Sequence, residues 1–100
     1  MATRERIEMD FRQAMRQADE VDEIASSLSR LADDKLEGSL ITLASGWTGE
    51  NANAYIKKGQ ALEGRINASA GDLRQVAEAI RSAARRIYEA EMTALAIASD

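Results

Sequence analysis

The side chains that most often carry catalysis or bind metal are missing from this sequence. It contains no histidine and no cysteine, so the commonest general base, the usual zinc ligands and a thiol nucleophile are all absent. Ser26, Ser27 and Ser29 have no histidine or lysine arranged to activate them. We therefore expect a protein that is not an enzyme and that uses no cofactor.

Carboxylates are the remaining candidates for metal binding. The densest acidic run is Asp19-Glu20-Val21-Asp22-Glu23. Carboxylate-bridged helical bundles also need Glu-x-x-His pairs, which this chain cannot supply, so we interpret the run as a solvated helix face. The stretch Gly46-Trp47-Thr48-Gly49 lacks the lysine of a phosphate-binding loop. We expect no metal site and no phosphate site.

The charge balance argues against a nucleic-acid partner. The formal net charge is −4 and the isoelectric point is about 4.9, whereas phosphate binding needs an electropositive face. Four arginines share one side of a helix, namely Arg74, Arg81, Arg85 and Arg86. We interpret them as a solubilising face paired with Glu78 and Glu89.

Neither end of the chain indicates a membrane anchor. No apolar run approaches the roughly 20 residues that span a bilayer. Residues 1–6 are followed by no apolar stretch of the kind found in signal peptides, so we expect no cleaved signal. Wide apolar stripes can open onto lipid, so a membrane-active hairpin stays an alternative, which the acidic charge disfavours.

Composition and periodicity predict one all-α domain over residues 1–100. Apolar residues make up 45% and charged residues 30%, without proline, which is typical of long helices. We expect residues 1–8 to be loosely ordered, and a first helix over about 10–44, beginning where Asp10 and Gln13 resemble a capping box. Its apolar stripe, in steps of three and four, comprises Phe11, Met15, Ala18, Val21, Ala25, Leu28, Ala32, Leu36, Leu40 and Leu43.

A second helix is predicted over about 50–93, with a stricter heptad seam. That seam comprises Gly59, Leu62, Ile66, Ser69, Leu73, Val76, Ile80, Ala83 and Ile87. Ala70, Ala77, Ala84 and Met92 form a second row beside it. The heptad spacing continues without a shift around Gly71, so we favour a continuous helix. We expect Ala94 to Asp100 to be frayed.

The predicted turn, residues 45–49, contains the only tryptophan. Gly46 and Gly49 supply backbone freedom on either side of Trp47, and Thr48 can cap the next helix. An indole is costly to leave in water, so we expect Trp47 to be covered by the hairpin or by another protein.

Two such helices form a thin antiparallel hairpin. Each covers only one side of the other, which leaves apolar rows in water. Pairing of two hairpins into a four-helix bundle dimer would bury those rows. The alternative is that the same face binds a different helical protein.

These features resemble the WXG-type, ESAT-like family of type VII (ESX) secretion substrates. The resemblance covers nearly the whole chain and includes Leu43, Gly46, Trp47, Gly49, Ala52 and the aromatic Tyr55. It implies a helical hairpin that pairs with itself or with a paralogous partner and leaves a bacterial cell without a cleaved signal peptide.

The resemblance also implies an export signal that a secretion ATPase reads. In the family, the turn tryptophan of one subunit lies near a C-terminal Y-x-x-x-D/E of its partner. Here Tyr88 is followed at the fourth position by Met92, and the acid, Glu91, comes at the third. Positions three and four apart share a helix face, so Trp47, Gly49, Tyr88 and Glu91 are the expected recognition residues.

Besides the membrane-active hairpin, three functions remain open from the sequence. The first is a secreted type VII substrate or adaptor that acts by binding. The second is a non-secreted chaperone or targeting partner for a larger type VII toxin. The third is a structural coiled-coil module in which Trp47 closes a bundle end.

Overall fold

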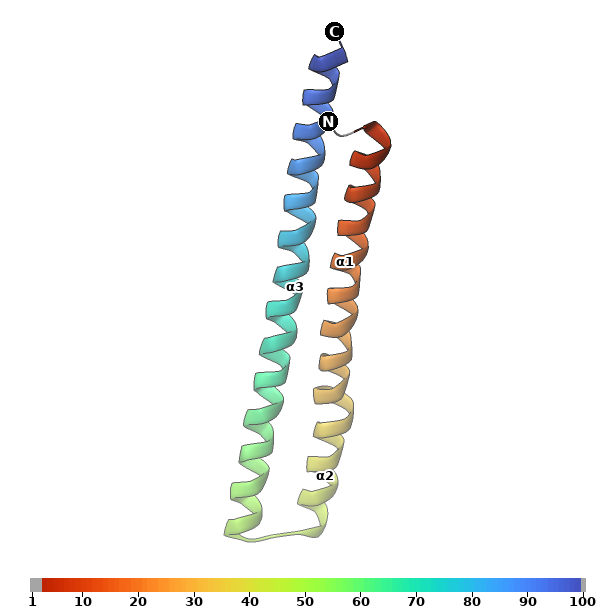
Figure 1. Cartoon of the computed structure of the whole chain (residues 1–100). Coiled ribbons are helices and arrows are strands. Elements are labelled where there is room, and N and C mark those ends of the chain that lie inside the picture. Colours follow the sequence, from red (N-terminus) through yellow and green to blue (C-terminus); the bar gives the residue numbers. More distant parts are fainter. Residues whose placement is uncertain (1–2, 100) are drawn as a thin grey trace. The chain divides into compact units, whose positions relative to one another are not determined.

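Helices account for nearly all of the computed structural model, which describes residues 3–99 (Figure 1). In chain order they are α1 (Arg4–Arg30), a π-helical segment η1 (Leu31–Leu36), α2 (Glu37–Gly46) and α3 (Glu50–Ser99). No strand occurs among these residues, so the predicted all-α class is confirmed.

The chain divides into two compact units. The terminal unit comprises Met1–Asp22 and Arg74–Asp100, and the turn unit comprises Glu23–Leu73. In the terminal unit, the start of α1 lies alongside the later part of α3 (Figure 1). In the turn unit, the end of α1, η1 and α2 lie alongside the first part of α3, so this unit is a helical hairpin.

The first helix begins at Arg4, so the expectation of a start near residue 10 after a loose segment was wrong for residues 4–8, whereas residues 1–2 lie outside the described residues. Thr3 provides the cap, because its hydroxyl accepts the backbone N–H of Arg6 at 3.2 Å. Asp10 lies inside the helix, where it pairs with Arg6 at 3.3 Å. The added turns bury Ile7, which is only 3% exposed, so apolar packing extends the helix beyond the predicted boundary.

The segment η1 changes the spacing of the residues that face inward along α1, η1 and α2. Alanines recur every seven residues at Ala18, Ala25 and Ala32, but the next buried residue, Leu40, follows Ala32 by eight. The wider π turn accommodates this extra residue, and the backbone N–H of Glu37 donates to the carbonyl of Ala32, five residues earlier. Leu40 therefore faces inward in place of Ser39.

The second helix continues to Ser99. It passes Gly71 without interruption, as expected, whereas the prediction of a frayed end from Ala94 was wrong for residues 94–99. Asp100 lies outside the described residues. Between residues 3 and 99, no helix combines the length and apolar character that a membrane span requires.

Alanine dominates the interior of each unit. The buried apolar residues of the terminal unit are Ile7, Ala18, Ala77 and Ala84. Those of the turn unit are Ala25, Ala32, Leu40, Ala52 and Ala70. Small side chains let two helices approach closely, but each buried methyl group contributes only about 0.8 kcal/mol.

The predicted seam of larger residues lies beside this alanine row. Leu62, Val76 and Ile87 are 48%, 48% and 57% exposed, whereas Ala70, Ala77 and Ala84 are buried. Phe11, Leu28, Ile66, Leu73 and Ile80 are half-buried. The interior of each unit therefore contains the alanine row together with the half-buried members of the predicted seam. A role for the larger residues in a dimer stays a prediction.

Candidate protein-binding surfaces

The connection between α2 and α3 depends on one glycine. Trp47 has extended backbone angles and its N–H donates to the carbonyl of Leu43 at 3.0 Å. Gly49 has a φ of 116°, which side-chain-bearing residues rarely adopt. Its carbonyl accepts the N–H of Asn53 at 3.0 Å, so Gly49 holds the N-cap position predicted for Thr48. Gly46 is helical and supplies no special conformation.

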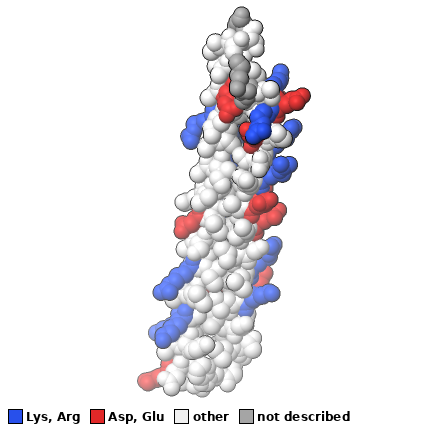
Figure 2. Space-filling view, viewed as in Figure 1, with Lys and Arg blue, Asp and Glu red and all other residues white. Residues whose placement is uncertain are grey.

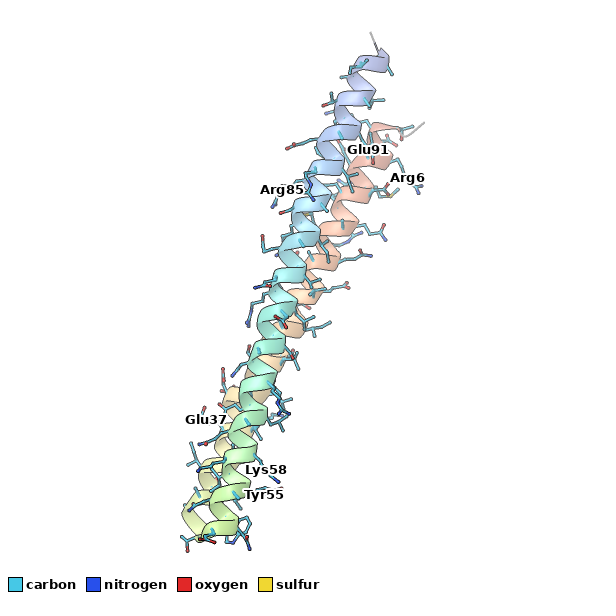
Figure 3. All side chains as sticks on the ribbon, turned by 90° about the vertical axis from the view of Figure 1, so that its left-hand side faces the viewer. Arg6, Glu37, Tyr55, Lys58, Arg85 and Glu91 are labelled. Atoms are coloured by element: carbon cyan, nitrogen blue, oxygen red, sulfur yellow. The ribbon has the colours of Figure 1, made fainter. Side chains whose placement is uncertain are left out.

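Trp47 is only partly covered by its own chain. It is 41% exposed, and its ring centroid lies 5.9 Å from that of Tyr55, at an interplanar angle of 55°. Tyr55 projects from the first turns of α3 and is itself 60% exposed (Figure 3). The two rings form an exposed aromatic pair within the turn unit.

A shallow groove runs along α2 beside this pair. It is wide open to solvent, has a volume of about 790 Å³ and is lined by one helical segment alone, through Asp34, Lys35, Gly38, Ser39, Thr42, Leu43, Gly46 and Trp47. Glycine, serine and threonine make up half of its lining, because they recur at helical spacing along one side of the segment. We call this feature the α2 groove.

The second pair of predicted recognition residues lies in the terminal unit. Tyr88 makes an edge-to-face contact with Phe11, with ring centroids 4.9 Å apart. Tyr88, Glu91 and Phe11 line a cavity of about 160 Å³ together with Ile7 and Asp10. Glu91 lies on α3 where it faces the first turns of α1 (Figure 3). Tyr88 is thus half-buried by its own chain.

An arginine ties the two helical segments of the terminal unit together. Arg81 donates to Asp22 at 2.6 Å, to Asp19 at 2.8 Å and to Glu78 at 2.8 Å, and its side chain is 15% exposed. Hydrogen bonds to Asp19 and Asp22 raise the pKa of Arg81 above its ordinary value. The pairing with Glu78 was expected. Asp19 and Asp22 remain 67% and 38% exposed, as expected for a solvated face, and in addition pair with this arginine.

Three carboxylates gather inside the turn unit. Oxygens of Asp33, Glu37 and Glu63 lie within 4.8 Å of one another, and the amide of Asn67 donates to Asp33 at 3.1 Å. Loss of water around Glu63 raises its pKa, and the negative charges of Glu37 and Asp33 raise it further. Sequence reasoning missed this cluster. Asp33 and Glu37 share the four-residue spacing of a helix side, but Glu63 is brought in only by the hairpin.

The four expected recognition residues separate into two local sites. Trp47 and Gly49 belong to the turn unit, and Tyr88 and Glu91 belong to the terminal unit. Within each unit the paired residues are close, because Trp47 is followed by the turn glycine and Tyr88 shares a cavity with Glu91. Comparison of the chain with protein-family models, with curated proteins and with solved structures finds no match.

Proposed function

We propose that this protein acts by binding other helical proteins, as a small substrate or adaptor of a type VII secretion system. It works without catalysis, and its partners are a second hairpin and the secretion ATPase. It is made in a bacterial cytoplasm and exported without a cleaved signal peptide. The specific type VII assignment comes from the resemblance of the turn sequence.

The single observation that carries a binding function is the distribution of apolar side chains. Seven of the nine buried apolar residues in the described chain are alanines. Among the large apolar residues that the structure describes, only Ile7 and Leu40 are buried; the others are half-buried or exposed, and Ile24, Leu31, Leu62, Val76 and Ile87 are each between 45% and 57% exposed. Burying one such side chain fully is worth roughly 1.5–3 kcal/mol, so the exposed ones leave hydrophobic free energy for a partner to gain.

In Figure 2 charged side chains lie mostly along the two edges of the face shown, with uncharged residues between them, except near the chain ends, where charged side chains also lie on its front. Within this proposal, Trp47 and Gly49 present one recognition surface to the export machinery. Tyr88 and Glu91 present the other.

Export of Trp47 variants tests the proposal. In a bacterium with an active type VII system, Trp47→Arg is expected to reduce the amount of protein in the culture medium at least tenfold at equal cellular level. Trp47→Phe keeps an aromatic ring and should retain most export. Ile41→Arg places the same charge at an exposed position of α2 outside the groove (Ile41 is 63% exposed) and should export normally. Undiminished export of Trp47→Arg would contradict the role of Trp47.

The alternative is a non-secreted chaperone or targeting partner for a larger type VII toxin. It is favoured by Met92 at the position of the family's acid and by the contact that half-buries Tyr88 against Phe11. This alternative predicts that the protein stays in the cell, and that deleting it lowers the stability or export of a cargo protein.

A further inference from the structure

A half-enclosed cavity lies between α1 and α3 inside the terminal unit. It has a volume of about 160 Å³, and most of its lining is apolar or aromatic, including the buried Ile7 and the rings of Phe11 and Tyr88. Two carboxylates, those of Asp10 and Glu91, complete the lining. Because two helical segments both contribute, the cavity exists only in the folded unit and not on one helix alone.

The two carboxylates differ in how far they are neutralised. Asp10 pairs with Arg6 at 3.3 Å. Between residues 3 and 99, no lysine or arginine lies within ion-pair distance of Glu91, and the residues three and four positions away on its helix are uncharged. Glu91 is half-buried. It therefore places a partly dehydrated negative charge beside apolar walls, without a counter-ion among the described residues.

A charge in this position favours a cationic occupant. Drying a carboxylate that has no counter-ion is costly, so an incoming cation gains an ion pair with Glu91 as well as apolar contact. The edge-to-face rings of Phe11 and Tyr88 add aromatic surface, to which cations are attracted. The occupant should thus combine an apolar stem with a positively charged end.

The volume limits the size of that occupant. An apolar cavity of about 150 Å³ holds a molecule the size of benzene. The side chain of lysine, a flexible carbon stem that ends in a compact ammonium group, is of about this size. The planar guanidinium of arginine makes a longer side chain, which would fill the cavity less well.

Ile87 favours a protein over a free amine as the source of the lysine side chain. Ile87 lines the cavity and is nevertheless 57% exposed, so much of it lies at the rim. A small amine inside the cavity would leave that part of Ile87 in water. A helix that carries the lysine would cover it, and burial of this apolar surface would add to binding.

We infer that the cavity receives a lysine side chain of a partner protein, with its ammonium group at Glu91 and its stem beside Phe11 and Tyr88. This inference deepens the proposed binding function, on which it rests. It gives the chemistry that the surface formed by Tyr88 and Glu91 selects in the partner.

The first probe is n-butylammonium, which reproduces the end of a lysine side chain. Phe11 is the only phenylalanine, so its ring protons in the NMR spectrum of the full chain report on the cavity. Butylammonium should shift these signals with a dissociation constant on the order of 10 mM. The neutral 1-butanol, with the same stem, should bind at least about fivefold more weakly.

Glu91→Gln removes the charge and keeps the shape of the side chain. It should weaken butylammonium binding about tenfold. Glu89→Gln is the matched control, because it removes the same charge from an exposed residue of α3 outside the cavity, and it should change binding less than about twofold. Equal binding by the two variants, or butanol binding as tightly as butylammonium to the wild-type chain, would overturn the cation site.

A helical peptide tests the source of the lysine. An alanine-based helix with one central lysine should displace butylammonium and bind at least about tenfold more tightly, because it also covers Ile87. The same helix with methionine in place of lysine should bind at least about tenfold more weakly than the lysine peptide. A lysine peptide that binds no more tightly than butylammonium would overturn the protein partner and assign the cavity to free alkylammonium ions.

The outcomes for this inference and for the proposed function are separable. A chain that binds neither butylammonium nor the lysine peptide, yet is exported in a Trp47-dependent way, would overturn the inference and leave the proposed function standing. A chain that binds the lysine peptide through Glu91 and is never exported would do the reverse.

Discussion

Glu63 shows how one side chain can oppose the fold at neutral pH. Its pKa is raised from 4.5 by loss of water and by the charges of Glu37 and Asp33. A carboxyl group whose pKa is higher in the folded state stabilises the fold when protonated, below the unfolded pKa, and that stabilisation is lost as pH rises through the folded pKa. Ionised Glu63 is therefore unfavourable at pH 7.

We expect Glu63→Gln to raise the melting temperature at pH 7, because the neutral amide removes the repulsion. The gain should disappear on acidification below about pH 4.5, where the wild-type carboxyl is protonated. Thermal melts at pH 7 and pH 4 measure this, with the exposed Glu89→Gln as control. A Glu63→Gln gain that is equal at both pH values would contradict the repulsion.

Gly59 is a second residue with a specific steric role. A Cβ atom built there meets the side chain of Leu40, whereas a Cβ atom at Gly64, on the same helix, meets nothing within 4 Å. Gly64→Ala should raise the free energy of unfolding by about 0.5–1 kcal/mol, as expected for a helix interior.

At Gly59 the same gain is opposed by crowding that costs about 1–3 kcal/mol. Gly59→Ala should therefore be less stable than Gly64→Ala by that amount in urea denaturation. Equal stabilisation of both variants would show that Leu40 moves aside without cost.

At the scale of the element, η1 behaves as a single inserted residue. Deleting Asp34 should convert the π turn into ordinary α-helix while Leu40 keeps its inward position, so helicity is retained and stability changes by less than about 1 kcal/mol. Deleting Ala61 from α3, where no π turn can compensate, should rotate Gly59 and Ala70 onto different sides of the helix. The free energy of unfolding should then fall by about 3 kcal/mol or more.

Circular dichroism and urea denaturation distinguish the two deletions. Loss of the fold in the Asp34 deletion would contradict the role assigned to η1.

Arg81 connects α1 and α3 in the terminal unit. Arg81→Met should lower the melting temperature, because Asp19, Asp22 and Glu78 then repel one another without a cation between them. Arg85→Met, at an exposed position of the same helix, should have little effect. The difference between the two variants should shrink at 1 M salt, where charges are screened over about 3 Å. An unchanged difference would point to lost packing of the arginine stem.

The sequence predicted the helical elements well but not which of the two rows is the more deeply buried. The alanine row and the row of larger residues both keep a seven-residue period, so periodicity alone cannot rank them. Hydropathy favours leucine and isoleucine, whereas the close approach of two helices selects alanine. The phase change at η1 did have a signal, since Leu28, Ala32, Leu36 and Leu40 follow one another in steps of four without a step of three.

The candidate surfaces were predictable in part. The position of Trp47 between two helical patterns placed it at the turn, where we expected it to be covered by the hairpin or by another protein; the hairpin leaves it 41% exposed. The contact between Phe11 and Tyr88, and the convergence of Glu63 on Asp33, depend on the alignment of two antiparallel segments. That alignment is fixed by tertiary packing, which no local pattern encodes.

At the scale of the whole molecule, folding and association should be coupled. If two copies pack together, the melting temperature rises with concentration, since each tenfold increase adds about 1.4 kcal/mol to the free energy of unfolding per mole of dimer. Calorimetry at concentrations spanning two orders of magnitude measures this. A melting temperature independent of concentration would contradict self-association.

The alanine interior also has an evolutionary consequence. In most small domains the inside accepts exchange among large apolar residues of similar volume. Here Ala18, Ala25, Ala70 and Ala77 are fully buried, so any enlargement separates the two helices along their length. Sequence change in this chain should therefore conserve the buried alanines most strictly. The exposed large apolar residues can vary with the surface of the binding partner.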